Sequence, residues 1–286
     1  MVVKLGGRTQ SDAALPATLA LLWTASHGRM VVVHGGGDQI SALQRLRGEE
    51  PMFVGGRRVT TEGALELVRM VLSGLANKQL VSALTRAGAP AVGISGEDGA
   101  LLRAAPIDEA TFGFAGTPTR VDRRVIDALL AQGFLPVISP VATHDNLSVG
   151  GALNVNGDDA AAAIAAALGA TELFLLADVP GVLDANRQRI PVLSLESARA
   201  LVTSGVAGGG MAAKLDACAR AWAGGVIRVR IGDLAALSIP DAGTLIVASQ
   251  ALTVPTDALP SVASQALTLP TDALPSSASH SIAVPH

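Results

Sequence analysis

Short apolar runs alternate along the chain with longer segments rich in Ala and Leu. The short runs predict strands at Val2–Leu5, Met30–Val33, Ala91–Ile94, Leu135–Ile138, Leu173–Leu176 and Val226–Ile231. The longer segments predict helices over residues 11–27, 37–47, 61–87, 122–132, 157–168, 194–204 and 211–223. Continuously apolar strands that alternate with helices are typical of a parallel sheet covered on both faces. The pattern therefore predicts an α/β fold in which an open, mainly parallel sheet is sandwiched between helices.

Three places depart from this alternation. Residues 95–121 mix Gly, Pro and charged residues with short strand-like pieces, which predicts hairpins on one edge of the sheet. A helix stop at 168–170 predicts a boundary between a lobe over residues 1–169 and a lobe over residues 170–248. Residues 248–262 and 263–277 are nearly identical copies of one unit that carries almost no charge. This composition predicts a disordered low-complexity tail over residues 249–286, with a docking peptide as the alternative.

Composition and charge exclude several classes of protein. The net charge is -3 and aromatic residues make up 2%, which argues against nucleic-acid binding. The single cysteine, Cys218, excludes an intrachain disulfide and a cysteine-cluster metal site. No apolar run reaches the roughly 20 residues that span a membrane. The first residues fit a strand and a capped helix better than a signal peptide, so we expect a cytoplasmic location.

Two glycine-rich turns follow predicted strands. One joins Lys4 to Gly6 and Gly7, and the other is the HGGG run His34–Gly37. Glycines let backbone N–H groups approach an anion, and the second turn opens a helix whose N-terminus favours negative charge. His34 could act as a general base, but a structural role is favoured. Neither turn has the spacing of a Walker A or a dinucleotide-binding motif.

Lysine is rare in this chain, which gives its placement weight. Of the 21 basic residues only Lys4, Lys78 and Lys214 are lysines, and Lys214 follows three consecutive glycines. We expect Lys214 in the first turn of the helix 211–223, where a cation is unfavourable to the helix dipole. That position suggests a task such as binding a phosphate.

Polar residues precede and follow other predicted elements. Asn154 and Asn156 alternate before Asp158, which could hold a lysine or, less directly, a metal, and which also fits a helix cap. In the run 56–60, we interpret Arg57 as a solvated loop charge and Arg58 as a bidentate clamp for a carboxylate. The loop 177–183 follows a buried strand, where open parallel sheets bind ligands such as nucleotides.

Taken in the order in which they occur along the chain, these motifs resemble those of the amino acid kinase family, and within it the branch that phosphorylates N-acetylglutamate. The resemblance covers about residues 1–248. The segments that carry it are Lys4–Gly7, His34–Gly37, Gly56–Thr60, Ala76–Lys78, Asn154–Asp158, Asp178–Leu183, Gly210–Lys214 and Gly243–Thr244.

The resemblance implies a transferase that uses ATP to phosphorylate the γ-carboxylate of N-acetyl-L-glutamate, giving N-acetylglutamyl 5-phosphate in the second step of arginine biosynthesis. It implies that Lys4 and Lys214 stabilise the transition state, that Asp158 orients both lysines, and that Gly7 and Gly36 donate N–H groups to the moving phosphoryl. It assigns substrate binding to Gly35, Gly36, Arg58 and Asn154. It assigns nucleotide binding to Asp178, Val179, Pro180, Gly181, Val182, Leu183, Val206, Ala207 and Gly208. It implies Mg²⁺ held by the ATP phosphates, with few protein ligands.

The chain departs from the family pattern at two positions. Arg57 stands where the family usually has an apolar residue, and Gly157 stands where Ala is common. Neither position has a named role, although Arg57 could alter the acyl or carboxylate pocket. Lys4 lies so near Met1 that the N-terminal helix of arginine-inhibited hexameric members has no counterpart. We therefore expect a homodimer without arginine feedback.

Three other functions remain open at this stage. The first is phosphorylation of an aminoadipate or glutamate linked to a carrier protein, which the net charge of -3 favours little. The second is phosphorylation of N-succinylglutamate. The third is a ligand sensor without catalytic activity, which the presence of Lys4, Asp158 and Lys214 disfavours.

Overall fold

The computed structural model describes residues 1–248 of the chain. A sheet of 11 strands runs through this part. The strands are β1 (Val2–Leu5), β2 (Val31–His34), β5 (Ala91–Gly96), β6 (Leu102–Pro106), β7 (Ala115–Val121), β8 (Leu135–His144), β9 (Ala152–Val155), β10 (Glu172–Leu176), β11 (Val192–Ser194), β12 (Arg228–Gly232) and β13 (Thr244–Val247). A separate hairpin pairs β3 (Phe53–Val54) with β4 (Arg57–Arg58).

The order of the strands is β11-β13-β12-β10-β1-β2-β8-β6-β7-β9, and β5 also pairs with β8. The central strands are parallel: β1 lies between β10 and β2, and β2 pairs with β8. Antiparallel pairs occur toward the two ends, where β12 meets β13 and β6 meets β7. The predicted mainly parallel sheet is confirmed, and the hairpin predicted within 95–121 is β6–β7.

The α-helices are α1 (Leu15–Ala25), α2 (Gly37–Leu46), α3 (Glu62–Val68), α4 (Asn77–Arg86), α5 (Glu109–Phe112), α6 (Arg124–Ala131), α7 (Gly157–Leu168), α8 (Leu195–Thr203) and α9 (Gly209–Ala223). The short helical turns are η1 (Arg8–Ser11), η2 (Arg69–Ala76), η3 (Asp98–Ala100) and η4 (Leu234–Leu237). The helix predicted over 61–87 is the continuous run α3–η2–α4, with a π-helical middle. The helix predicted over 11–27 begins later, at Leu15, with Pro16 in its first turn.

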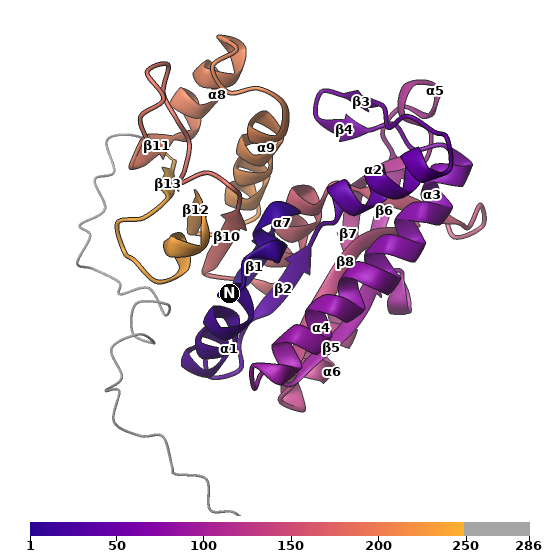
Figure 1. Cartoon of the computed structure of the whole chain (residues 1–286), viewed down its shortest axis with the longest axis horizontal. Coiled ribbons are helices and arrows are strands. Elements are labelled where there is room, and N and C mark those ends of the chain that lie inside the picture. Colours follow the sequence, from indigo (N-terminus) through magenta and orange to yellow (C-terminus); the bar gives the residue numbers. More distant parts are fainter. Residues whose placement is uncertain (249–286) are drawn as a thin grey trace, which may run out of the picture.

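The two faces of the sheet are covered by different helices, and Figure 1 shows α4 on the near face and α6 on the far one. Val3 and Leu5 of β1 pack with residues of α1 and α4. Val2 packs in the other cluster, with residues of α7 and α9. Because alternate side chains of a strand point to opposite faces, Lys4 lies on the same face as Val2, against α7 and α9.

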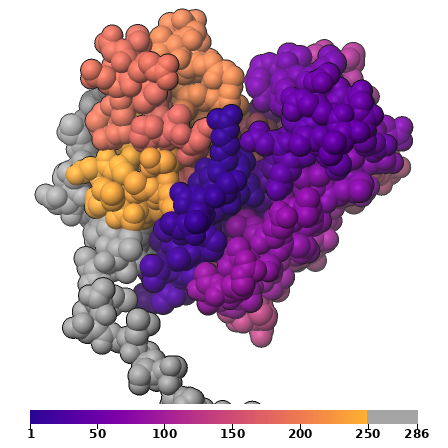
Figure 2. Space-filling view, in the orientation of Figure 1, coloured from indigo at the N-terminus to yellow at the C-terminus, as the bar shows by residue number. Residues whose placement is uncertain are grey.

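The strands that follow residue 170 occupy one end of the sheet, and β10 joins them to β1. In the space-filling view an indentation separates the coral and orange residues from the purple ones, with indigo residues between them (Figure 2). Within residues 1–248 no helix is long and apolar enough to cross a membrane. The predicted tail over 249–286 lies outside the described residues.

Candidate active site

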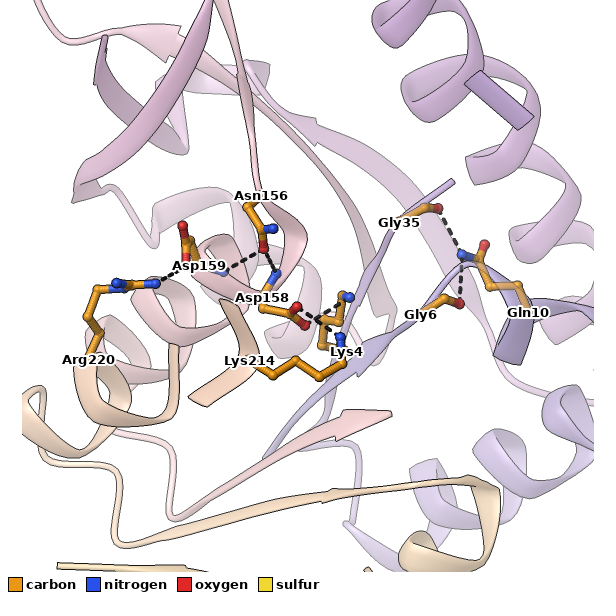
Figure 3. Close-up of polar contacts among 9 residues, drawn as sticks. All are labelled: Lys4, Gly6, Gln10, Gly35, Asn156, Asp158, Asp159, Lys214 and Arg220. Carbon is orange, nitrogen blue, oxygen red and sulfur yellow. Dashed lines mark hydrogen bonds and ion pairs between the residues drawn. The ribbon is translucent and has the colours of Figure 1, made fainter. Parts of the chain in front are cut away.

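Lys4, Asp158 and Lys214 form one buried charged cluster, as predicted. The Lys4 Nζ atom lies 2.8 Å from Asp158 Oδ1, and the Lys214 Nζ atom lies 3.0 Å from Asp158 Oδ2. The side chains of Lys4, Asp158 and Lys214 are 8%, 4% and 12% exposed. Each carboxylate oxygen therefore has its own ammonium partner, and the cluster carries one net positive charge (Figure 3).

Three elements bring these residues together. Asn156 caps α7, since its Oδ1 atom accepts hydrogen bonds from the backbone N–H groups of Asp158 at 2.8 Å and Asp159 at 3.4 Å. Both acidic residues thus lie in the first turn, where the helix dipole favours negative charge. The helix α9 begins at Gly209 rather than near Met211, so Lys214 is in its second turn and the dipole argument of the sequence analysis is wrong. Glycine is a poor helix former, so three consecutive glycines before Met211 favour a later helix start than the structure shows.

The protonation of the cluster follows from burial and charge. Burial lowers the pKa of Lys4, and the attraction of Asp158 opposes that effect. Burial acts to raise the pKa of Asp158, but the two lysines outweigh it and hold that pKa below its usual range. The carboxylate is therefore ionised at neutral pH, and its charge opposes the effect of burial on Lys4.

A cavity of about 210 Å³ opens beside this cluster. Every residue that the sequence analysis assigned to the substrate lines it: Gly35, Gly36, Arg58 and Asn154. Lys4 and Gly7 line it as well. The structure thus brings the positive cluster, both glycine turns and a guanidinium to one cavity.

Arg58 is held in a fixed position at the wall of the cavity. It is 7% exposed and donates hydrogen bonds to Gln44 Oε1, to Ser41 Oγ at 2.8 Å and to the Gly37 carbonyl at 3.0 Å. Its guanidinium lies 4.7 Å from the ring centre of Phe53. Among the described residues no acidic group forms an ion pair with Arg58, so its charge is available to an anionic ligand. The sequence analysis missed Ser41 and Gln44, which share one face of α2.

Gln10 connects the two glycine turns. Its Nε2 atom donates to the Gly35 carbonyl at 2.8 Å and to the Gly6 carbonyl at 3.3 Å (Figure 3). A Cβ atom at Gly36 would lie 2.7 Å from Leu72 Cδ2, so no larger residue fits there without a shift. This contact, rather than an unusual backbone angle, explains the glycine.

His34 is structural, as the sequence analysis favoured. It is fully buried, and burial lowers its pKa to about 4. The Asn77 side-chain amide lies 3.1 Å from His34 Nε2, and His34 Nδ1 lies 2.9 Å from the Gly35 carbonyl. Both contacts fit a neutral imidazole that carries its proton on Nδ1.

The metal alternative for Asp158 finds no support. Both of its oxygens are paired with lysines. Residues 1–248 contain no group of three or more His, Cys, Asp or Glu residues that could hold a metal ion.

Asn154 lines the cavity, and its Nδ2 atom donates a hydrogen bond to Thr60 Oγ1 at 2.9 Å.

The segment predicted to bind a nucleotide follows β10 at the carboxyl end of the sheet, beside the end of β1 that carries Gly6. Asp178 is exposed and lies 2.7 Å from Arg8 Nη1. Val182 is fully buried and Ala207 is 4% exposed, so their side chains belong to the core and only their backbones could face a ligand. Of the other predicted residues, Val206 is 41% exposed.

The two departures from the family pattern, Arg57 and Gly157, both line the cavity. Arg57 is not a solvated loop charge, because its Nη1 atom lies 2.6 Å from Asp159 Oδ2 and its side chain is 21% exposed. Gly157 contacts the cluster, since a Cβ atom there would lie 3.1 Å from Lys4 Cε.

This fold and the paired lysines at a cavity define an α/β phosphotransferase. The model of the amino acid kinase family matches residues 1–233, and the chain belongs to that family. An acetylglutamate kinase of Azorhizobium caulinodans is 42% identical over 248 residues, which cover 82% of this chain and 81% of that protein. An acetylglutamate kinase of Sulfurovum sp. is 41% identical, covering 82% of this chain and 83% of the other. This chain is therefore a kinase.

Solved structures support the same fold. A Streptococcus mutans protein superposes with a TM-score of 0.79 at 29% identity, covering 87% of this chain and 98% of its own. The N-acetylglutamate synthase of Neisseria gonorrhoeae, in complex with coenzyme A and N-acetyl-glutamate, gives a TM-score of 0.71 at 25% identity over 86% of this chain and 58% of that chain.

Proposed function

We propose that this chain transfers the γ-phosphoryl group of ATP to the γ-carboxylate of N-acetyl-L-glutamate, the second step of arginine biosynthesis. The observation that carries the proposal is the cavity lined by both Lys4 and Arg58, in which Lys4 is paired through Asp158 with Lys214. The acetylglutamate kinases that share about 40% of this sequence support the choice of substrate.

Arg58 binds the α-carboxylate of the substrate. Its guanidinium is already oriented by Gln44, Ser41 and the Gly37 carbonyl, so little side-chain entropy is lost when a carboxylate binds. A planar guanidinium matches a carboxylate with two parallel hydrogen bonds. Gly35 and Asn154 supply polar groups to the same cavity.

The chemical step moves no proton. A γ-carboxylate oxygen attacks the γ-phosphorus, the bond from that phosphorus to the bridging oxygen of ATP breaks, and ADP leaves with the electron pair. Lys4 and Lys214 stabilise the negative charge that spreads over the moving phosphoryl, and Asp158 holds the two ammonium groups in place. Backbone N–H groups of Gly7 and Gly36 add donors. Preorganised donors of this kind contribute about 2.7–4 kcal/mol each to the transition state.

The nucleotide lies along the carboxyl ends of β10 and β1, against the segment 178–183 and residues 206–208. Mg²⁺ would be held by the phosphates of ATP, since both oxygens of Asp158 are taken by lysines and that residue is not free to bind a metal. Magnesium typically keeps its waters and few protein ligands, and when bound it neutralises phosphate charge. Residues 1–169 then form the lobe for the acyl amino acid and residues 170–248 the lobe for the nucleotide.

The homodimer and the cytoplasmic location are part of the same proposal. Met70 and Leu75 of η2 are 63% and 53% exposed, and a second copy seated on them would remove both from water. The substrates ATP and an acyl amino acid belong to cytoplasmic metabolism.

The test is ADP release with N-acetylglutamate, N-succinylglutamate and free aspartate as parallel acceptors. We expect turnover with N-acetylglutamate well above that with the other two. Turnover only with N-succinylglutamate would show that the substrate carries a succinyl rather than an acetyl group. Turnover with none of the three would favour a carrier-linked substrate or a sensor. Either result would contradict the proposal.

A further inference from the structure

The hairpin β3–β4 forms part of the cavity wall but has little apolar packing of its own. Phe53 and Val54 are 54% and 44% exposed. Gly55 and Gly56 at the turn have φ angles of +56° and +78°. A two-stranded hairpin without a core is marginally stable in water. Other contacts must therefore hold the hairpin, and with it Arg58, at the cavity.

Adjacent arginines fasten the hairpin in two directions. Successive side chains of a strand point to opposite faces. Arg58 turns toward α2, where it bonds Ser41. Arg57 turns toward α7, where its guanidinium pairs with Asp159 at 2.6 Å.

Asp159 is the shared partner of two arginines. Its side chain is 1% exposed, and it is paired with Arg57 of β4 and with Arg220 of α9 (Figure 3 shows the second pair). A buried carboxylate is costly unless it is paired, so Asp159 holds both guanidinium groups close. The two arginines are 21% and 44% exposed, which leaves each of them partly solvated.

The same turn of α7 thus meets α9 at two points. Asp158 meets Lys214, and Asp159 meets Arg220 six positions further on, about 9 Å along the helix axis. A second contact links the hairpin to α9 directly: a Cβ atom at Gly56 would lie 2.8 Å from the Gly209 carbonyl oxygen. The hairpin turn therefore rests on the first turn of the helix that carries Lys214.

We propose that Asp159 is a positioning residue that sets Arg58 and Lys214 relative to each other. Its ion pairs fix the hairpin and the helix α9 to one point at the start of α7. Arg58, which binds the substrate carboxylate, and Lys214, which stabilises the phosphoryl group, are then held at a fixed separation. The kinetic part of this inference rests on the proposed function; the structural part does not.

The kinetic test compares Arg57→Met, which keeps the apolar stem, with Arg57→Lys, which keeps the charge. We expect Arg57→Met to raise KM for N-acetylglutamate about tenfold, with KM for ATP within about twofold of wild type, and Arg57→Lys to restore most of the loss. Asp159→Asn should raise KM and also lower kcat, because it releases α9 as well. In the double variant the Arg57→Met effect on KM should vanish, since the partner is already lost.

The structural test needs no substrate. Hydrogen exchange should be about tenfold faster for the amides of residues 53–59 in Arg57→Met than in wild type, with α6 unchanged. Arg123→Met is the matched control, because the Nε atom of Arg123, the residue before α6, forms an exposed ion pair with Asp127 Oδ2 of α6 at 2.7 Å. It should leave both the hairpin amides and KM unchanged. Thermal unfolding of every variant checks that it is folded.

Unchanged hairpin exchange in Arg57→Met would overturn the proposal whatever the substrate. Unchanged KM, or effects of Arg57→Met and Asp159→Asn that multiply in the double variant, would also overturn it. A wild-type protein that does not turn over N-acetylglutamate would instead refute the proposed function, and hairpin exchange would still decide the role of Asp159.

Discussion

Replacing Lys214 by alanine removes one of the two ammonium groups from the candidate active site. Lys214 is 12% exposed and its Nζ atom lies 3.0 Å from Asp158, which Lys4 still neutralises in the variant at 2.8 Å. Asp158 is therefore not left alone, and the loss of stability should stay below the roughly 3–5 kcal/mol of breaking a buried pair outright. The variant should fold.

The catalytic loss is larger than the structural one. Two unit charges about 4 Å apart interact by about 4 kcal/mol at an effective dielectric constant of about 20. Loss of one preorganised donor typically lowers kcat by about 10²–10³. We therefore expect kcat of Lys214→Ala to fall by about 10³, with KM for N-acetylglutamate changed far less because Arg58 is untouched.

The assay is steady-state ADP release, with circular dichroism and thermal unfolding on the same preparations. Lys78→Ala is the matched control, because Lys78 is exposed and donates to the Gly93 carbonyl at 3.0 Å, away from the cavity. A kcat for Lys214→Ala within about tenfold of wild type would remove Lys214 from the transition state and refute the electrostatic reasoning.

Four further outcomes follow from the same account. Arg58→Lys loses the planar fork, so KM for N-acetylglutamate should rise by about tenfold or more while KM for ATP holds; parallel changes in both would contradict the clamp. The pKa of His34 is about 4 in the folded chain and about 6.5 when unfolded, so stability is complete above pH 6.5 and declines by up to about 3 kcal/mol as the pH falls to 4. Urea unfolding should show this slope in wild type and not in His34→Gln, and equal slopes would exclude a buried neutral histidine. A chain ending at Ala248 should turn over like the full chain, and lost activity would give the tail a role. Light scattering should report two copies, whereas a monomer or a hexamer would refute the homodimer.

Local patterns in the sequence predict the elements that carry Lys4 and Asp158, and the resemblance to the family adds their joint role. Lys4 lies in the short apolar strand β1, which is paired on both sides. Because side chains alternate along a strand, its position fixes the face of the sheet on which its side chain lies. Asp158 is placed by the cap Asn156, whose spacing to the helix is local. The place of each residue on its element is therefore a local property, whereas their pairing was expected from the resemblance to the family.

Residues brought together from distant elements could not be predicted in the same way. Asp159 of α7 pairs with Arg57 of β4 and with Arg220 of α9, and a charged residue in a short loop such as Arg57 is usually solvated. Gln44 and Ser41 look like ordinary polar positions of an amphipathic helix until Arg58 is placed against them. The strand Thr244–Val247 was also missed, since its strand character depends on pairing with β12.

The central claim is that the chain forms a mixed anhydride between phosphate and a substrate carboxylate. Hydroxylamine trapping tests it most directly, because an acyl phosphate reacts to give a hydroxamate that ordinary ATP hydrolysis cannot produce. The account predicts a hydroxamate that requires ATP, N-acetylglutamate and Lys214 together. ADP release without hydroxamate, or hydroxamate formed by Lys214→Ala at a rate within about tenfold of wild type, would contradict it.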